Sequence, residues 1–355
     1  MPLDRHLNGV GGMRFPARII TVLASVVALF GCSSASKGGA SGPAPGEGTS
    51  AGGDQTWTNG KEVADITIPA GATVTIAPGA TVTMAKGATI FVQGTLKARS
   101  RDQRSKLVGD GWVGIAVAPG GVVDLEGVDI ANAQMAIDGE GGTATYAYGT
   151  ISASGPFNVA QNAKLVVTHA TVAGATSPSF IYGEITATFL DYDANQVEGI
   201  IGQGDGAVIS IEDSKLHGQR SQDNDLVMSR ALSKIHVAYT DLSNAHCNFH
   251  FDNVDSFDIS FVSAHDGGYG MMLYGSSTTG AHTVKSSNIF KNYGRGAEEQ
   301  TLNTVNGVIT LSDGYWADNG GGPADNVRQF TGQIKVVNMS TTTPVEGVGP
   351  RGAVP

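Results

Sequence analysis

The sequence predicts an all-β fold, a single-stranded parallel β-helix (a solenoid) of about eleven coils. Three observations predict it. Apolar residues recur in three columns at intervals of 20 to 27 residues, an 8-residue repeat rich in β-branched residues precedes them, and the composition favours short strands and turns. A single coil cannot bury its own apolar face, so stacking of neighbouring coils must supply the core.

The three apolar columns define the repeating unit between residues 123 and 316. The anchors of successive coils are Ile130, Ile151, Val172, Tyr192, Leu216, Leu242, Ala264, Ile289 and Trp316. Five residues before these anchors lie Leu125, Tyr146, Val167, Ala187, Ile211, Val237, Ile259, Val284 and Leu311. Seven residues before them lie Val123, Ala144, Leu165, Ile185, Ile209, Ile235, Phe257, His282 and Ile309. The positions between the columns are mostly polar, so side chains alternate between core and solvent as they do in β-strands.

This alternation fixes which residues face the core. We expect Ile211, Val237 and Ile259 to stack inside and Glu212 and Ser260 to face water. A slip of one residue would reverse both sets, so the register is a testable prediction.

An earlier repeat extends the solenoid toward the N-terminus. Residues 71–76, 79–84 and 87–92 each begin with Gly-Ala-Thr and recur at a period of 8 residues. Alternating β-branched residues with a glycine at each corner predict three short strands joined by tight turns. Three such units approach the length of one later coil, which predicts a triangular coil with three faces.

These segments also carry a resemblance. Residues 66–80, followed by 93–96 and 111–115, resemble the opening coils of bacterial right-handed parallel β-helix proteins of the pectate-lyase-like superfamily, and residues 287–293 and 314–319 resemble the repeats of that group. The resemblance covers residues 57–338 and implies the fold. It implies no single activity, because this fold carries lyases, hydrolases, adhesins and inert scaffolds.

The N-terminal residues 1–31 are typical of a lipoprotein signal peptide. Arg14 and Arg18 precede an apolar run at 19–30, which is too short for a comfortable membrane span and ends at Gly31-Cys32. This ending resembles the bacterial lipobox, in which the cysteine is lipidated, and implies Cys32 as the first residue of the mature chain. The alternative is an ordinary secretory signal with an incidental cysteine.

The remaining boundaries follow from composition. Residues 32–56 are rich in Ser, Gly and Ala and are predicted to form a flexible tether, 57–338 the β-helix domain, and 339–355, which lack periodicity, a loose tail. With Cys32 lipidated, the chain is expected in a bacterial cell envelope, anchored to the outer membrane and either periplasmic or exposed at the cell surface. With Cys32 lipidated, no second cysteine remains for a disulfide with Cys247, which is expected to be buried.

The composition limits the partners. The formal net charge of −10 argues against nucleic acid, since phosphate binding needs a basic surface. The expected partners are the membrane, through the Cys32 lipid, and an envelope protein or polysaccharide. No cofactor is expected.

Stacking turns column mates into spatial neighbours, and one outward column offers Ser210, His236 and Asp258. This is the order of nucleophile, base and orienting carboxylate, at about 5 Å per coil. The alternative is a solvated column of side chains with a His–Asp pair at the surface. We favour this alternative because the sequence shows no motif for an oxyanion hole beside Ser210. No catalytic assignment follows.

A second group suggests a metal site. Imidazole, thiolate and carboxylate donors occur together at His246, Cys247, His250 and Asp252, with His265 and Asp266 one coil later. The alternative is a set of histidines satisfied at the surface or in turns, because a turn in this segment makes convergence unpredictable. His246, His250 and His265 therefore stay candidates.

Two classes of function remain open. The first is a lipid-anchored, non-catalytic envelope scaffold or adhesin-like protein that binds a protein or glycan along a long β-face. The second is a polysaccharide lyase or glycoside hydrolase of the β-helix type. The resemblance implies calcium-binding acidic residues with a nearby basic residue for the lyases and paired aspartates for the hydrolases. The close acidic pairs Asp223/Asp225 and Asp252/Asp255 lack those surroundings, so we favour the non-catalytic class.

Overall fold

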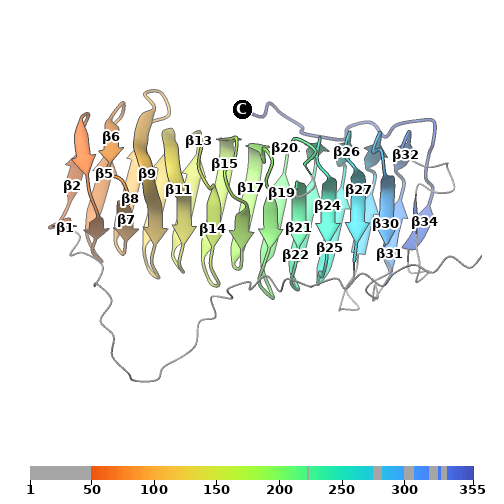
Figure 1. Ribbon diagram of the computed structural model, residues 1–355, viewed down its shortest axis with the longest axis horizontal. Coiled ribbons are helices and arrows are strands. Elements are labelled where there is room, and N and C mark those ends of the chain that lie inside the picture. Colours follow the sequence, from red (N-terminus) through yellow and green to blue (C-terminus); the bar gives the residue numbers. More distant parts are fainter. Residues whose placement is uncertain (1–48, 222–223, 275–281, 300–307, 320–326, 329–333) are drawn as a thin grey trace, which may run out of the picture. The chain divides into compact units, whose positions relative to one another are not determined.

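The computed structural model describes residues 49–221, 224–274, 282–299, 308–319, 327–328 and 334–355, which form a stack of parallel strands (Figure 1). These residues are all-β, without a helix, and wind into a parallel β-solenoid of about 11 turns of the right-handed type. The predicted fold class is confirmed. Within the described residues no helix is long and apolar enough to cross a membrane.

Three strands per turn build three faces, named A, B and C. Face A contains β2 (Gln55–Trp57), β5 (Thr73–Ile76), β8 (Thr95–Arg99), β10 (Val122–Glu126), β12 (Thr143–Ala147), β19 (Val208–Glu212), β22 (Lys234–Ala238), β25 (Ser256–Ser260), β28 (His282–Lys285), β31 (Ile309–Ser312) and β34 (Ile334–Val337). Face B contains β3 (Lys61–Val63), β6 (Thr81–Met84), β13 (Thr150–Ser152), β20 (Lys215–His217), β23 (Asp241–Ser243), β26 (Ser263–His265), β29 (Asn288–Phe290) and β32 (Tyr315–Ala317).

Face C contains β1 (Thr49–Ser50), β4 (Ile66–Ile68), β7 (Thr89–Val92), β14 (Phe157–Val159), β16 (Ser179–Ile181), β18 (Ile200–Gly202), β21 (Asp225–Ser229), β24 (Cys247–Phe251), β27 (Tyr269–Leu273), β30 (Arg295–Glu299) and β33 (Val327–Arg328). Four longer strands run through two faces each. They are β9 (Ser105–Val117) and β11 (Val128–Gly139) in faces B and C, and β15 (Lys164–Ala173) and β17 (Glu184–Asp193) in faces A and B.

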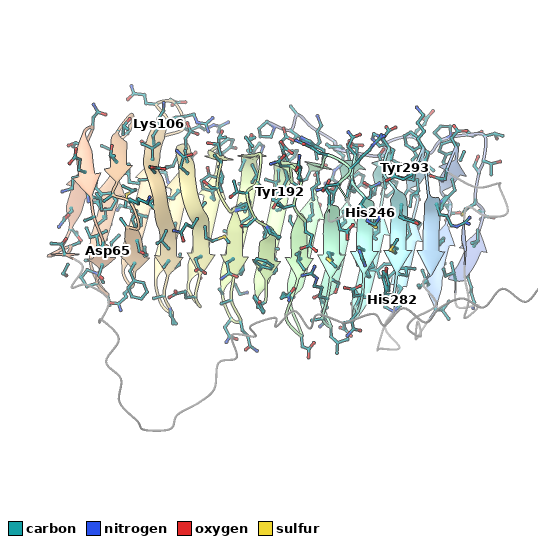
Figure 2. The ribbon with its side chains drawn as sticks, in the orientation of Figure 1. Asp65, Lys106, Tyr192, His246, His282 and Tyr293 are labelled. Atoms are coloured by element: carbon teal, nitrogen blue, oxygen red, sulfur yellow. The ribbon has the colours of Figure 1, made fainter. Side chains whose placement is uncertain are left out.

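The predicted register is confirmed. Val237 pairs with Ile211 on one side and Ile259 on the other, and all three side chains are fully buried. Glu212 and Ser260 lie on the outward side of the same strands and are partly exposed. His282, the one polar member of the three columns (labelled in Figure 2), is also buried, and its ring packs against Phe257.

The corner between faces A and B is lined by side chains in left-handed backbone conformation. Their φ angles lie between 48° and 54°, and the residues are Tyr148, His169, Phe189, Asp213, Tyr239 and Phe261. A Cβ atom makes this conformation costly, so a compensating contact is needed. Stacking supplies it, with ring centroids 4.8 Å apart for Tyr148–His169, 4.5 Å for His169–Phe189 and 4.8 Å for Tyr239–Phe261.

The C-terminal tail differs from the prediction of a loose segment at 339–355. It runs back along the solenoid (Figure 1) and is held at several turns. Val345 exchanges two hydrogen bonds with Asn288, of 2.8 and 3.0 Å, and Gly349 N–H donates to the Phe261 carbonyl at 2.9 Å. Arg351 donates to the buried carboxylate of Asp213. A segment without periodicity is thus fixed by the polar groups of the turns beneath it.

The first strand also begins earlier than the predicted domain boundary at residue 57. Thr49–Ser50 pairs with Ile66 and Thr67 of β4, and Ala51 is fully buried. The part of the predicted tether that the structure describes, residues 49–56, therefore belongs to the first turn of the solenoid.

Buried asparagines fix the backbone near the C-terminal end of the stack. Asn292 accepts a hydrogen bond from Asn248 and donates one to Asn319, at 3.1 and 3.0 Å, so three turns are linked. Asn248 lies inside β24, between Cys247 and Phe249. This ladder holds the strand that carries the candidate site.

Candidate functional site

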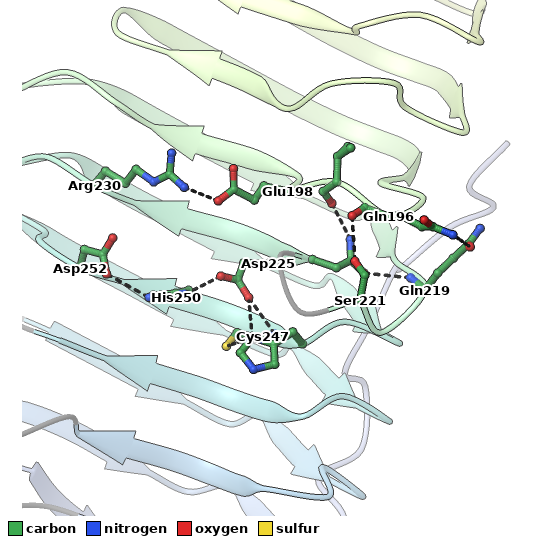
Figure 3. A network of polar contacts seen from close by, with 12 residues as sticks. Gln196, Glu198, Gln219, Ser221, Asp225, Arg230, Cys247, His250 and Asp252 are labelled. Carbon is green, nitrogen blue, oxygen red and sulfur yellow. Dashed lines mark hydrogen bonds and ion pairs between the residues drawn. The ribbon is translucent and has the colours of Figure 1, made fainter. Parts of the chain in front are cut away.

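Face C carries a group of ionisable side chains on, or directly beside, its neighbouring strands β21 and β24. We call Asp225, His246, Cys247, His250 and Asp252 the imidazole–carboxylate cluster (Figure 3). Asp225 opens β21 and is the direct register partner of Cys247, which opens β24. The geometry of a parallel ladder therefore brings together residues that are 22 positions apart in the chain.

Asp225 is the centre of the cluster. Its side chain is only 7% exposed. One carboxylate oxygen accepts the Cys247 backbone N–H at 3.0 Å and lies 3.3 Å from Nδ1 of His246, and the other lies 2.5 Å from Nδ1 of His250. Burial alone would raise the pKa of Asp225, but the hydrogen bonds with His246 and His250 outweigh it and lower that pKa below its usual value.

His250 lies between two carboxylates. Its Nδ1 faces Asp225 and its Nε2 lies 3.0 Å from Asp252, while its ring stacks on Tyr274 with centroids 5.0 Å apart. Burial by itself lowers the pKa of His250, but the hydrogen bonds to Asp225 and Asp252 overcome it and raise that pKa to about 9. At neutral pH the His250 imidazolium accordingly balances the buried Asp225 charge.

Cys247 and His246 complete the cluster. The Cys247 side chain is buried, as predicted, and its Sγ lies 3.4 Å from Nδ1 of His246. The His246 ring meets Tyr269 edge to face, with centroids 5.7 Å apart (Figure 2 labels His246). Ligand atoms of Asp225, Cys247 and His250 all lie within 4.8 Å of one another. These three residues therefore offer a carboxylate, a thiol and an imidazole at one point, and the second imidazole, His246, lies beside the carboxylate and the thiol.

His265, the third predicted metal candidate, does not join this cluster. It lies on β26 of face B, where Nε2 is 3.1 Å from Asp241 and Nδ1 is 2.6 Å from Asp266. Its ring stacks on Phe290. The structure thus brings His246 and His250 together, adds Asp225 to them, and places His265 in a separate ion-pair network.

The column Ser210, His236 and Asp258 is aligned on face A as the sequence predicts. The imidazole, however, lies between two carboxylates. Its Nε2 is 3.5 Å from Glu212 and its Nδ1 is 3.4 Å from Asp258. The side chains of His236 and Asp258 are 39% and 63% exposed, so both are well solvated. Neither ring nitrogen is directed at Ser210, and the arrangement is that of a surface ion pair.

Sequence reasoning overlooked Asp225 as a member of this cluster and treated it only as half of the acidic pair Asp223/Asp225. The signal that identifies it is its register position, one turn before Cys247. Asp223 and the predicted lipidation residue Cys32 lie outside the described residues.

Comparisons of the chain with protein-family models, with curated proteins and with solved structures return no match. The architecture therefore rests on the structure itself, and the resemblance to the pectate-lyase-like superfamily stays a prediction.

Proposed function

We propose that this chain is a lipid-anchored, non-catalytic binding protein of a bacterial cell envelope, and that face A of the solenoid meets a protein or glycan partner. The observation that carries the proposal is the regularity of that face. From β10 to β34, successive strands of face A pair turn by turn in one continuous register. Such a face suits an extended partner, because its side chains repeat at about 4.8 Å per turn.

The side chains that face A presents support binding rather than chemistry. The outward column is short and mostly polar along most of the stack, with Thr145, Thr186, Ser210, Thr283 and Thr310 among its members. Val166, which is 40% exposed, adds an apolar contact on the same column. The ionisable groups His236 and Asp258 are solvated, whereas transition-state stabilisation needs preorganised charge in a water-excluded pocket.

The anchoring part of the proposal rests on the sequence order of basic residues, apolar run and Gly31-Cys32. Replacing Cys32 with Ala should move the protein from the membrane fraction to the soluble fraction and abolish incorporation of labelled palmitate. Ser33→Ala, the adjacent position, is the matched control and should stay in the membrane. A Cys32→Ala protein that remains membrane-bound and labelled contradicts the anchor.

The binding part is tested with the released Cys32→Ala protein and isolated envelopes. Saturable binding is expected, and Thr186→Arg on face A should weaken it severalfold because a long cation disrupts the flat contact. Thr171→Arg, on the face B part of β15, is the control and should bind as before. An equal loss of binding in the Thr186→Arg and Thr171→Arg variants contradicts a role of face A. Turnover of any polysaccharide or ester that disappears with His236→Ala would overturn the non-catalytic assignment.

A further inference from the structure

We propose that Asp225, His246, Cys247 and His250 bind one divalent transition-metal ion, with zinc(II) as the best match. This inference concerns face C and is independent of the binding function proposed for face A. A thiolate, two imidazoles and one carboxylate are the ligands that zinc prefers, whereas calcium and magnesium prefer oxygen donors alone.

The spacing of the donors is the first argument. Bond lengths of about 2.0–2.1 Å to nitrogen or oxygen and about 2.3 Å to sulfur give tetrahedral edges of about 3.3 Å for N···O and about 3.6 Å for N···S. Nδ1 of His246 lies 3.3 Å from an Asp225 oxygen and 3.4 Å from Sγ of Cys247. Two edges of a tetrahedral site are therefore already close to their final length.

His250 supplies the remaining corner. Its Nδ1 and the second Asp225 oxygen are 2.5 Å apart. A shared ion would replace this hydrogen bond, and because a four-coordinate site takes one oxygen of Asp225, the carboxylate would turn so that the oxygen facing His246 also comes within about 3.3 Å of Nδ1 of His250. Binding would release the Nδ1 proton of His250 and the thiol proton of Cys247 to solvent, which makes the affinity fall with decreasing pH.

The surroundings of the donors are the second, independent argument. Nε2 of His250 lies 3.0 Å from Asp252, so Nε2–H can donate to that carboxylate and leave Nδ1 as the ligand atom. A histidine ligand oriented by a carboxylate is the usual outer arrangement of protein zinc sites. The Cys247 N–H fixes Asp225, while Tyr274 stacks on the His250 ring. Asp225, Cys247 and His250 are thus held on two paired strands, and His246 directly precedes the second of them.

The experiment uses the full chain, reduced and freed of metal, with cobalt(II) as the spectroscopic probe and zinc(II) as competitor. One equivalent of cobalt should produce a near-ultraviolet thiolate-to-cobalt charge-transfer band, and zinc should displace it. Cys247→Ser should lose the band. Asp252→Asn, which keeps all four ligands, should weaken binding by about 10–100-fold, as expected for a residue that positions a metal ligand.

Two further variants keep the result decisive. His246→Ala removes a donor whose side chain is 30% exposed, so it should lower affinity without disturbing the fold, which circular dichroism checks. His265→Ala is the matched control, since it also removes a histidine that contacts a carboxylate but lies outside the cluster. The proposal is overturned if the reduced wild-type chain takes up no cobalt or zinc, if the charge-transfer band survives Cys247→Ser, or if His265→Ala weakens binding as much as His246→Ala.

Discussion

Ile259→Asp should disrupt the solenoid around β25 at neutral pH, whereas Ser260→Asp should be tolerated. Ile259 is fully buried and pairs with Val237 on one turn and Val284 on the next. Ser260, its neighbour in the chain, faces outward and pairs with Lys285. The two variants place the same carboxyl on opposite faces of one strand, so their difference tests the register directly.

The expected penalty for Ile259→Asp has two parts. Loss of a fully buried isoleucine side chain costs about 1.5–3 kcal/mol. The new carboxyl must also stay protonated at pH 7, about three units above the ordinary aspartate pKa, and at about 1.36 kcal/mol per unit this adds about 4 kcal/mol. The sum of about 6 kcal/mol is comparable to the whole unfolding free energy of many domains, about 5–15 kcal/mol.

The second part depends on pH with a defined sign. Burial raises the folded-state pKa of the new carboxyl, so the penalty grows as the pH rises above the unfolded-state value of about 3.9. Lowering the pH from 7 to about 4.5 should therefore recover about 3 kcal/mol in Ile259→Asp and almost nothing in Ser260→Asp. Urea unfolding followed by circular dichroism at both pH values measures this. Equal midpoints for the two variants at pH 7 would refute the assignment of Ile259 to the core.

Three other predictions follow from the described contacts. Arg351→Ala should make the C-terminal tail sensitive to limited proteolysis, because it removes the hydrogen bonds to Asp213 and the contact with the Tyr239 ring. Acid should do the same in the wild type, since the hydrogen bonds from Arg351 lower the folded-state pKa of Asp213. Their contribution to stability is complete above the unfolded-state pKa of Asp213 and is lost as the pH falls through the lowered folded-state pKa. NMR titration should give His265 a pKa above its usual value, chiefly because of its hydrogen bond with Asp241. The contribution of this hydrogen bond to stability is complete below the unfolded-state histidine pKa of about 6.5 and is lost as the pH rises through the folded-state pKa of His265. Tyr192→Phe should lower the unfolding free energy by about 1 kcal/mol in chemical denaturation, since the buried hydroxyl bonds to Ser179 at 3.0 Å, and an unchanged midpoint would contradict that bond's contribution.

The fold was predictable because the three apolar columns of the sequence depend only on burial in the core and on the alternation of side chains along each strand. Val237 and its neighbours are apolar for the same reason in every turn, and parallel stacking leaves one register that buries them all. The corner between faces A and B was not predictable in this way. Left-handed conformation is expected of Gly or Asn, whereas Tyr148, His169 and Phe189 adopt it here and recover the cost by stacking on the turns above and below.

The tail was misjudged for a related reason. Its sequence has no periodicity because it does not form a turn of the solenoid, and periodicity indicates only the segments that form turns. The tail is held by the Asp213 carboxylate at the corner between faces A and B. Asp213 is 4% exposed and separates the two aromatic stacks, and Arg351, 138 residues later, fills that position with its guanidinium 3.8 Å from the Tyr239 ring centroid. A partner at such a separation cannot be read from local sequence.

The imidazole–carboxylate cluster on face C includes contacts between successive turns, which the spacing of residues along the sequence does not predict. Spacing within one strand places His250 and Asp252 on one side, which the structure bears out. It cannot reveal Asp225, because that residue belongs to the previous turn and meets Cys247 only through the register of the two strands. Only the register Asp225 to Cys247 joins the carboxylate to the thiol and the imidazoles. The contacts of Cys247 and His250 with Asp225 tie β21 to β24. The same contacts that hold the buried charge of Asp225 thus also hold two consecutive turns together, which explains how a cluster this polar is accommodated beside the core.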